Sequence, residues 1–120
     1  MAEESAKMDI QSQGGVKLVT LADQKILDEL SISEIGNKLN GLVAESKPPK
    51  IVINFANVTN MSSSALGMLI TLHKRVREAN GDLRLCNIQP SIEEVFKITR
   101  LNEVFDMKPS VDEAVDSIES

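Results

Sequence analysis

The sequence predicts an α/β fold in which helices pack against a mixed or parallel sheet. Strand-like and helical patterns alternate along most of the chain, and KIVINF at 50–55 is apolar at consecutive positions, as in a strand covered on both faces. The length of 120 residues and a hydrophobic content of 42% suit one domain with one core. We therefore expect a single domain over residues 1–120, with residues 1–7 as a flexible N-terminus.

The first half of the chain predicts a hairpin, a helix and a central strand. VKLVTL at 16–21 alternates as a strand does, and residues 7–13 pair with it through Gly14 and Gly15. Residues 31–46 carry a helical apolar stripe, and Ser31 and Glu34 have the spacing of a capping box. KPPK at 47–50 ends this helix, and the central strand follows.

The second half predicts two helices separated by a strand, then a short strand and a last helix. Helical spacing runs from Ser63 to Ala79, and DLRLCNI at 82–88 has the pattern of a strand. Pro90, with Ser91 and Glu94, opens a third helix that runs through Ile98. EVFDM at 103–107 is strand-like, and the last helix lies behind Ser110, with apolar positions Val111, Ala114, Val115 and Ile118.

Composition excludes several classes of function. Thirteen Lys and Arg against eighteen Asp and Glu give a net charge of -5, which argues against a nucleic-acid partner. No apolar run is long enough to span a membrane, and the N-terminus lacks a secretory signal, so we expect a cytoplasmic protein without a membrane partner. A single cysteine, Cys86, excludes an internal disulfide and is expected to be buried.

Three consecutive serines, residues 62–64, stand where the central strand leads into the second predicted helix. A helical wheel places Ser63 on the solvent side, and the simplest interpretation of the residues alone is a helix cap with solvated neighbours. The one histidine, His73, is ten positions further along, about 15 Å away at 1.5 Å rise per residue, too far for a Ser–His pair. Zinc-ligand and nucleotide-binding motifs are also missing, so we expect no enzyme, no cofactor and no metal site.

The run from KIVINF through NVTNMSSSALGML to LNEVF, residues 50–105, resembles the STAS domain family, and more narrowly the bacterial anti-sigma factor antagonists. KILDE at 25–29 resembles the family's step into its first helix, with Asp28 on the family's aspartate. The resemblance covers nearly the whole chain and implies a STAS-type α/β fold with a mixed sheet of four or five strands and about four helices.

The resemblance also implies a role. Members of the family bind an anti-sigma factor that is a serine kinase, and the kinase switches the antagonist off by phosphorylating a serine at the start of the second helix. That phosphoacceptor corresponds to Ser63. The implied partner-binding residues are Asp28, Thr59, Asn60, Met61, Ser62, Ser63, Ser64, Ala65 and Gly67.

Three positions differ from the family pattern. Ser62 stands in place of an aspartate, Ala65 in place of a glycine, and Asn54 where the strand often ends in aspartate. Two alternatives therefore stay open beside the phosphorylated antagonist: a constitutive scaffold subunit of a larger signalling or transport assembly, and a module that binds a small molecule or nucleotide. The sequence leaves the oligomeric state and the identity of the partner kinase open.

Overall fold

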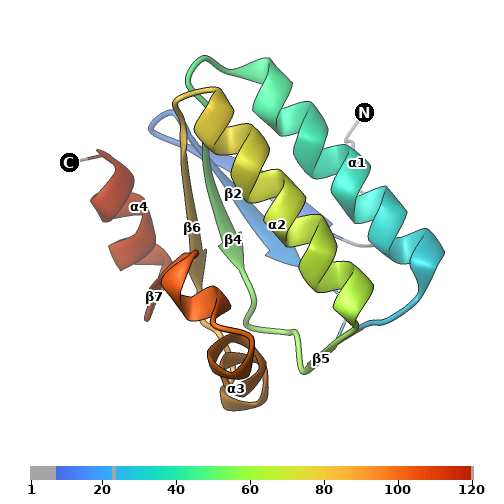
Figure 1. Cartoon of the computed structure of the whole chain (residues 1–120). Helices are drawn as coiled ribbons and strands as arrows, with labels where there is room; N and C mark the ends of the chain where they lie inside the picture. The colour runs from blue at the N-terminus through green and yellow to red at the C-terminus, as the bar shows by residue number, and fades with distance from the viewer. Residues whose placement is uncertain (1–7, 23, 120) are drawn as a thin grey trace.

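A five-stranded mixed sheet forms the centre of the molecule in this computed structural model, which describes residues 8–22 and 24–119 (Figure 1). The strand order is β1-β2-β4-β6-β7; β1 is antiparallel to β2, and the other neighbours are parallel. The strands are β1 (Met8–Gln13), β2 (Val16–Leu21), β4 (Lys50–Asn54), β6 (Asp82–Cys86) and β7 (Asp106–Lys108). The predicted α/β class and mixed sheet are confirmed. Residues 1–7, expected to be flexible, lie outside the described residues.

The central strand β4 is covered on both faces, as its apolar run predicts. Ile51 and Ile53 point to one face and belong to the larger buried cluster, whereas Val52 points to the other face and belongs to the smaller one. All three side chains are at most 1% exposed. The same alternation occurs in β6, where Leu85 joins the larger cluster and Cys86 the smaller.

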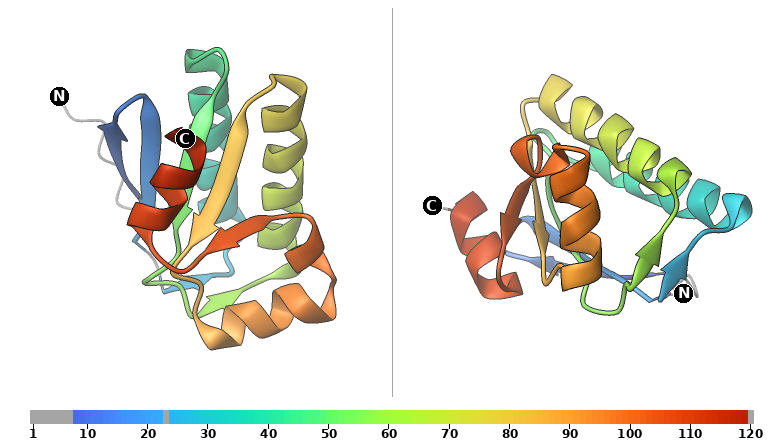
Figure 2. Two further views of the ribbon diagram at one scale, coloured as in Figure 1. Left: turned by 90° about the vertical axis from the view of Figure 1, so that its left-hand side faces the viewer. Right: turned by 60° about the horizontal axis from the view of Figure 1, so that its bottom comes forward.

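Helices cover the two faces unequally. Helices α1 (Glu29–Glu45) and α2 (Ser63–Glu78) lie side by side over the larger cluster, and the shorter α4 (Val111–Glu119) covers the opposite face (Figure 2). Helix α3 (Pro90–Ile98) lies near the carboxyl ends of the parallel strands, with Ile92 and Phe96 buried in the larger cluster. In the described part of the chain, no helix has the length and apolar content needed to cross a membrane.

A second, two-stranded sheet was not predicted from the sequence. Strand β3 (Lys25–Ile26) pairs in parallel with β5 (Asn60–Met61), so the segment before α1 lies against the segment before α2. Two-residue strands carry no periodicity, so no hydrophobic pattern in the sequence indicates them.

Two local predictions were wrong. Helix α1 begins at Glu29 and is capped by Asp28, whose carboxylate accepts a 2.9 Å hydrogen bond from the Ser31 amide, so Ser31 is not the cap. The segment predicted as the strand 103–107 is instead split between the short 3-10 helix η1 (Leu101–Glu103) and β7. Local spacing does not distinguish these cases, because they depend on which backbone groups find partners elsewhere in the fold.

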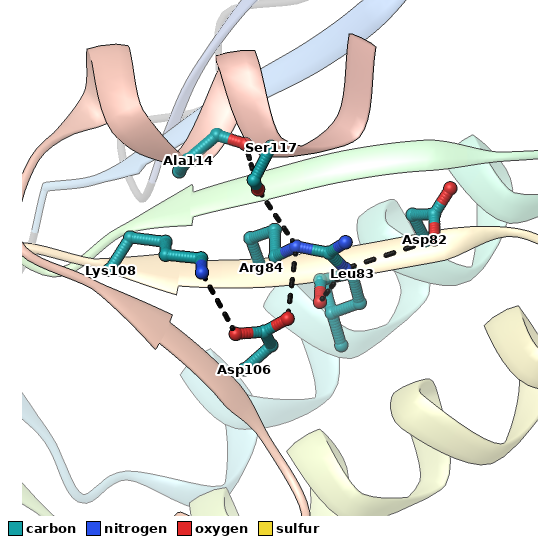
Figure 3. A network of polar contacts seen from close by, with 7 residues as sticks. All are labelled: Asp82, Leu83, Arg84, Asp106, Lys108, Ala114 and Ser117. Carbon is teal, nitrogen blue, oxygen red and sulfur yellow. Dashed lines mark hydrogen bonds and ion pairs between the residues drawn. The ribbon is translucent and has the colours of Figure 1, made fainter. Parts of the chain in front are cut away.

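A polar network on the α4 face of the sheet holds the last elements in place (Figure 3). The Arg84 guanidinium of β6 lies 3.2 Å from a carboxylate oxygen of Asp106 in β7 and donates a 2.9 Å hydrogen bond to the Ser117 hydroxyl of α4. Lys108 lies 3.5 Å from the other oxygen of Asp106. One half-buried arginine therefore links the short edge strand and the last helix to β6.

Replacing Leu69 with alanine should test the packing of α2. Leu69 is 1% exposed in the larger cluster, so Leu69→Ala should lower the free energy of unfolding by about 2 to 5 kcal/mol through lost burial and a cavity. Urea unfolding monitored by circular dichroism measures this change. Thr71→Ala, on the exposed face of the same helix, should change it by less than about 0.5 kcal/mol. Equal effects of the two substitutions would contradict the placement of the helix.

Candidate functional site

The three serines lie at the start of α2, next to the start of α1 (Figure 1). The Ser62 amide donates a 3.0 Å hydrogen bond to the Ile26 carbonyl oxygen, continuing the pairing of Ile26 with Met61. The Thr59 amide donates at 2.7 Å to the Gln24 carbonyl oxygen. These backbone contacts bring together two segments more than thirty residues apart and place the two helix starts side by side.

The three serines have three different environments. Ser62 is the N-cap of α2, and its hydroxyl oxygen accepts a 3.2 Å hydrogen bond from the Ala65 amide. The Ser64 hydroxyl donates a 2.8 Å hydrogen bond to a carboxylate oxygen of Glu29. The Ser63 side chain is exposed and makes no hydrogen bond with any residue that the structure describes. Its hydroxyl is therefore the one of the three that is accessible and unengaged.

The other residues expected at the site are not all on the surface. Asn60 and Gly67 are exposed, and the space around Gly67 is open. Met61 is half-buried against the core. Thr59 is also half-buried, and its hydroxyl lies 3.1 Å from the side-chain oxygen of Asn60. Ala65 is 0% exposed, so its methyl group packs inside the protein and is not part of the surface.

Asp28 is exposed, and its carboxylate serves as the cap of α1. It therefore lies at the same end of the molecule as the serines.

Sequence reasoning missed Glu29, which lies beside the serines, and two exposed leucines close to it in the sequence. Glu29 contacts Ser64 directly, and Leu27 and Leu30 on either side of it are 51% and 68% exposed. A signal for Leu30 was available, because it lies off the apolar stripe that α1 turns toward the core. No sequence signal identifies the contact of Glu29 with Ser64, since it joins residues 35 positions apart.

Burial shifts the pKa values of the two other reactive side chains, His73 and Cys86. Burial, and secondarily the charge of Arg77, lower the pKa of His73 below 6.5. The His73 ring packs edge-on against the Phe105 ring, with 5.3 Å between the ring centroids. Burial raises the pKa of the Cys86 thiol to about 11, which disfavours a nucleophilic thiolate. Among residues 8–22 and 24–119, no cluster of three or more His, Cys, Asp or Glu side chains could hold a metal ion.

The chain has recognisable relatives. The family model of the STAS domain matches residues 7–114. The anti-sigma F factor antagonist of Paenibacillus polymyxa is 20% identical over 112 residues, covering 93% of this chain and 92% of that protein. A STAS-domain containing protein of Pseudomonas aeruginosa is 31% identical over 58 residues. That match covers 48% of this chain and 57% of the relative, so it spans little more than half of the relative's length.

Solved structures share the fold. The anti-sigma-factor antagonist (STAS) domain protein of Planctomyces limnophilus has a TM-score of 0.86 at 22% identity, covering 94% of this chain and 98% of that one. The anti-sigma factor antagonist SpoIIAA of Bacillus is similar in its unphosphorylated form, with a TM-score of 0.71 at 19% identity over 94% of this chain and 98% of that one. Its phosphorylated form has a TM-score of 0.70 at 18% identity, covering 92% and 98%.

Alanine substitutions should separate the structural serine from its exposed neighbour. Ser62→Ala removes the N-cap and should lower the free energy of unfolding by about 1 kcal/mol. Ser63→Ala removes no side-chain hydrogen bond to a described residue and should change the free energy of unfolding by less than about 0.5 kcal/mol. Chemical denaturation of both variants beside wild type measures the difference. A larger loss in Ser63→Ala than in Ser62→Ala would contradict these environments.

The stability of the protein should depend on pH through His73. Its pKa is lowered in the folded chain, so the unfolded chain takes up a proton first as the pH falls below 6.5. The contribution of neutral His73 to the free energy of unfolding is therefore fully present above pH 6.5 and is lost as the pH falls below this value. Urea unfolding at about pH 7.5 and about pH 5.5 should show a smaller loss in His73→Gln than in wild type. An identical loss in both proteins would show that His73 does not contribute.

Proposed function

Because this chain belongs to the STAS domain family, we propose that it is an anti-sigma factor antagonist that binds a serine-kinase anti-sigma factor. In this proposal the kinase phosphorylates Ser63 and thereby ends the complex. The chain is then a single cytoplasmic domain over residues 1–120 that binds protein and has no catalytic activity of its own. The full-length similarity to an anti-sigma F factor antagonist supports this choice within the family.

The observation that carries the proposal is the state of the Ser63 hydroxyl. It is exposed, it makes no hydrogen bond within the described residues, and it lies at the first residue of α2. A kinase can reach this hydroxyl without breaking a contact of the fold. Ser62 and Ser64 are each engaged by another group. The exposed hydroxyl that no described group engages is at the position that matches the family's phosphoacceptor.

The effect of phosphorylation follows from electrostatics. A phosphoserine adds about -1.5 to -2 charges and three acceptor oxygens. The fold tolerates an anion at the start of α2, because the unpaired amides and the helix dipole favour negative charge there. A partner surface formed around the neutral serine meets a bulky dianion instead. Phosphate at Ser63 therefore weakens the complex and leaves the fold intact.

The three departures from the family pattern are compatible with this role. Ser62 keeps a capping oxygen at the helix start although the carboxylate is lost. The methyl group of Ala65 is buried and leaves the surface unobstructed. The Asn54 side-chain oxygen accepts hydrogen bonds from the Ala56 amide and the Asn87 side chain, which uses an acceptor that an aspartate also has.

A phosphorylation and binding assay tests the proposal. The kinase partner should modify wild type and Ser64→Ala but not Ser63→Ala. Ser63→Asp, a partial mimic of phosphoserine, should weaken the complex by about 1 to 3 kcal/mol, or roughly 5- to 150-fold in dissociation constant. Isothermal titration calorimetry with the kinase purified from the native cell measures this change.

Thr71→Asp on the same helix is the matched control for the added charge, because the Thr71 side chain is exposed about two turns beyond Ser63. This variant should bind as wild type does. Thermal unfolding of Ser63→Asp should match that of wild type, since an acidic side chain suits the first turn. Equal binding by wild type and Ser63→Asp would instead favour a constitutive scaffold.

A further inference from the structure

One hydrogen bond joins the serine triplet to the first helix. The Ser64 hydroxyl donates to a carboxylate oxygen of Glu29 at 2.8 Å. Ser63, one residue earlier, has no side-chain hydrogen bond within the described residues, although both serines are exposed. Of these two adjacent exposed serines, Ser64 is therefore hydrogen-bonded to a carboxylate and Ser63 is not.

The backbone around this contact sets the positions of both residues. Ile26 pairs with Met61 across the small sheet, and its carbonyl oxygen accepts the Ser62 amide. Glu29 begins α1 directly after the capping residue Asp28. These backbone contacts hold the start of α1, with Glu29, next to the start of α2, with Ser64. The contact depends on these two helix starts and not on a single flexible loop.

Resting on the phosphoserine switch proposed above, we propose that Glu29 is a specificity-determining residue that directs phosphorylation to Ser63 by disfavouring Ser64. Glu29 acts through Ser64 and takes no part in the chemistry itself, so it is a positioning residue. Ser62 is disfavoured separately, because it is half-buried and its oxygen caps the helix.

The chemistry of the transfer explains the preference. The serine oxygen forms a bond to the γ-phosphorus of a nucleoside triphosphate bound to the kinase. The bond from that phosphorus to the bridging oxygen breaks, nucleoside diphosphate leaves, and the hydroxyl proton passes to a base of the kinase. At Ser64 the hydroxyl proton already points to Glu29, and the anionic triphosphate would have to approach a carboxylate. The Ser63 hydroxyl makes no such hydrogen bond with a described residue, so the first obstacle is absent there.

The size of the preference follows from the strength of the contact. A hydrogen bond to a charged group, weakened here by solvent, together with like-charge repulsion corresponds to about a tenfold discrimination between the two serines. A phosphate on Ser64 would also lie against Glu29. The Ser63 oxygen, by contrast, makes no hydrogen bond with a carboxylate of the described residues.

Mapping the phosphate in variants of Glu29 tests the inference. Wild type, Glu29→Ala and Glu29→Gln are expressed in the native cell, and the tryptic peptide 51–74, which contains all three serines, is sequenced by mass spectrometry. Glu29→Ala should raise the ratio of phosphate on Ser64 to phosphate on Ser63 by about tenfold. Glu29→Gln, which keeps an acceptor and loses the charge, should raise it less.

Two controls separate specificity from folding. Glu34→Ala removes another exposed carboxylate from α1 and should leave the phosphate on Ser63. In a Ser63→Ala background, replacing Glu29 with alanine should raise the amount of phosphate on Ser64 by about tenfold. Thermal unfolding of each variant confirms that the fold persists, and a merely structural role of Glu29 would not move the position of the phosphate.

The outcomes distinguish this inference from the proposed function. Phosphate on Ser63 alone in both wild type and Glu29→Ala would overturn the role of Glu29 and leave the switch standing. Less phosphate on Ser64 in Glu29→Ala than in wild type would also overturn it, because Glu29 would then promote modification. A peptide without phosphate in wild type and in every variant would overturn the switch itself, and the inference with it.

Discussion

Burial of strand β4 on both faces is the constraint on which the rest of the structure depends. Its consecutive apolar side chains have to be covered twice, so α1 and α2 pack on one face and α4 on the other. Parallel neighbours on both sides leave the carboxyl ends of β2, β4 and β6 at one edge of the sheet. Everything with a proposed role lies where the chain leaves that edge.

The exit from β4 decides how the site is built. Two turn residues and the buried Val58 lead to β5, whose pairing with β3 places the two helix starts next to each other. Helices α1 and α2 also share one hydrophobic cluster. Their relative position is therefore fixed both by the backbone pairing of β3 with β5 and by packing in the core. This frame suits the proposed role of Ser63, in which the serine is presented to another protein and carries a phosphate while its helix stays folded.

Three chemically identical side chains acquire separate roles from this frame. A cap, a contact with a carboxylate and a hydroxyl that no described residue engages occur at three successive residues. The chain at the start of α1, next to the start of α2, carries the acidic groups Asp28 and Glu29 and the exposed side chains of Leu27 and Leu30. Such a surface suits the proposed protein partner, because apolar area supplies binding energy and the added phosphate charge opposes it.

The sequence by itself determined the order of the main strands and helices along the chain and the exposure of Ser63, because hydrophobic periodicity directly reports which side chains face the core. It also pointed to the family through the serine motif. Only the tertiary structure decided the β3–β5 pair, the cap at Asp28 and the contact of Glu29 with Ser64. These features join short segments far apart in the chain, and no local pattern records which distant residues meet.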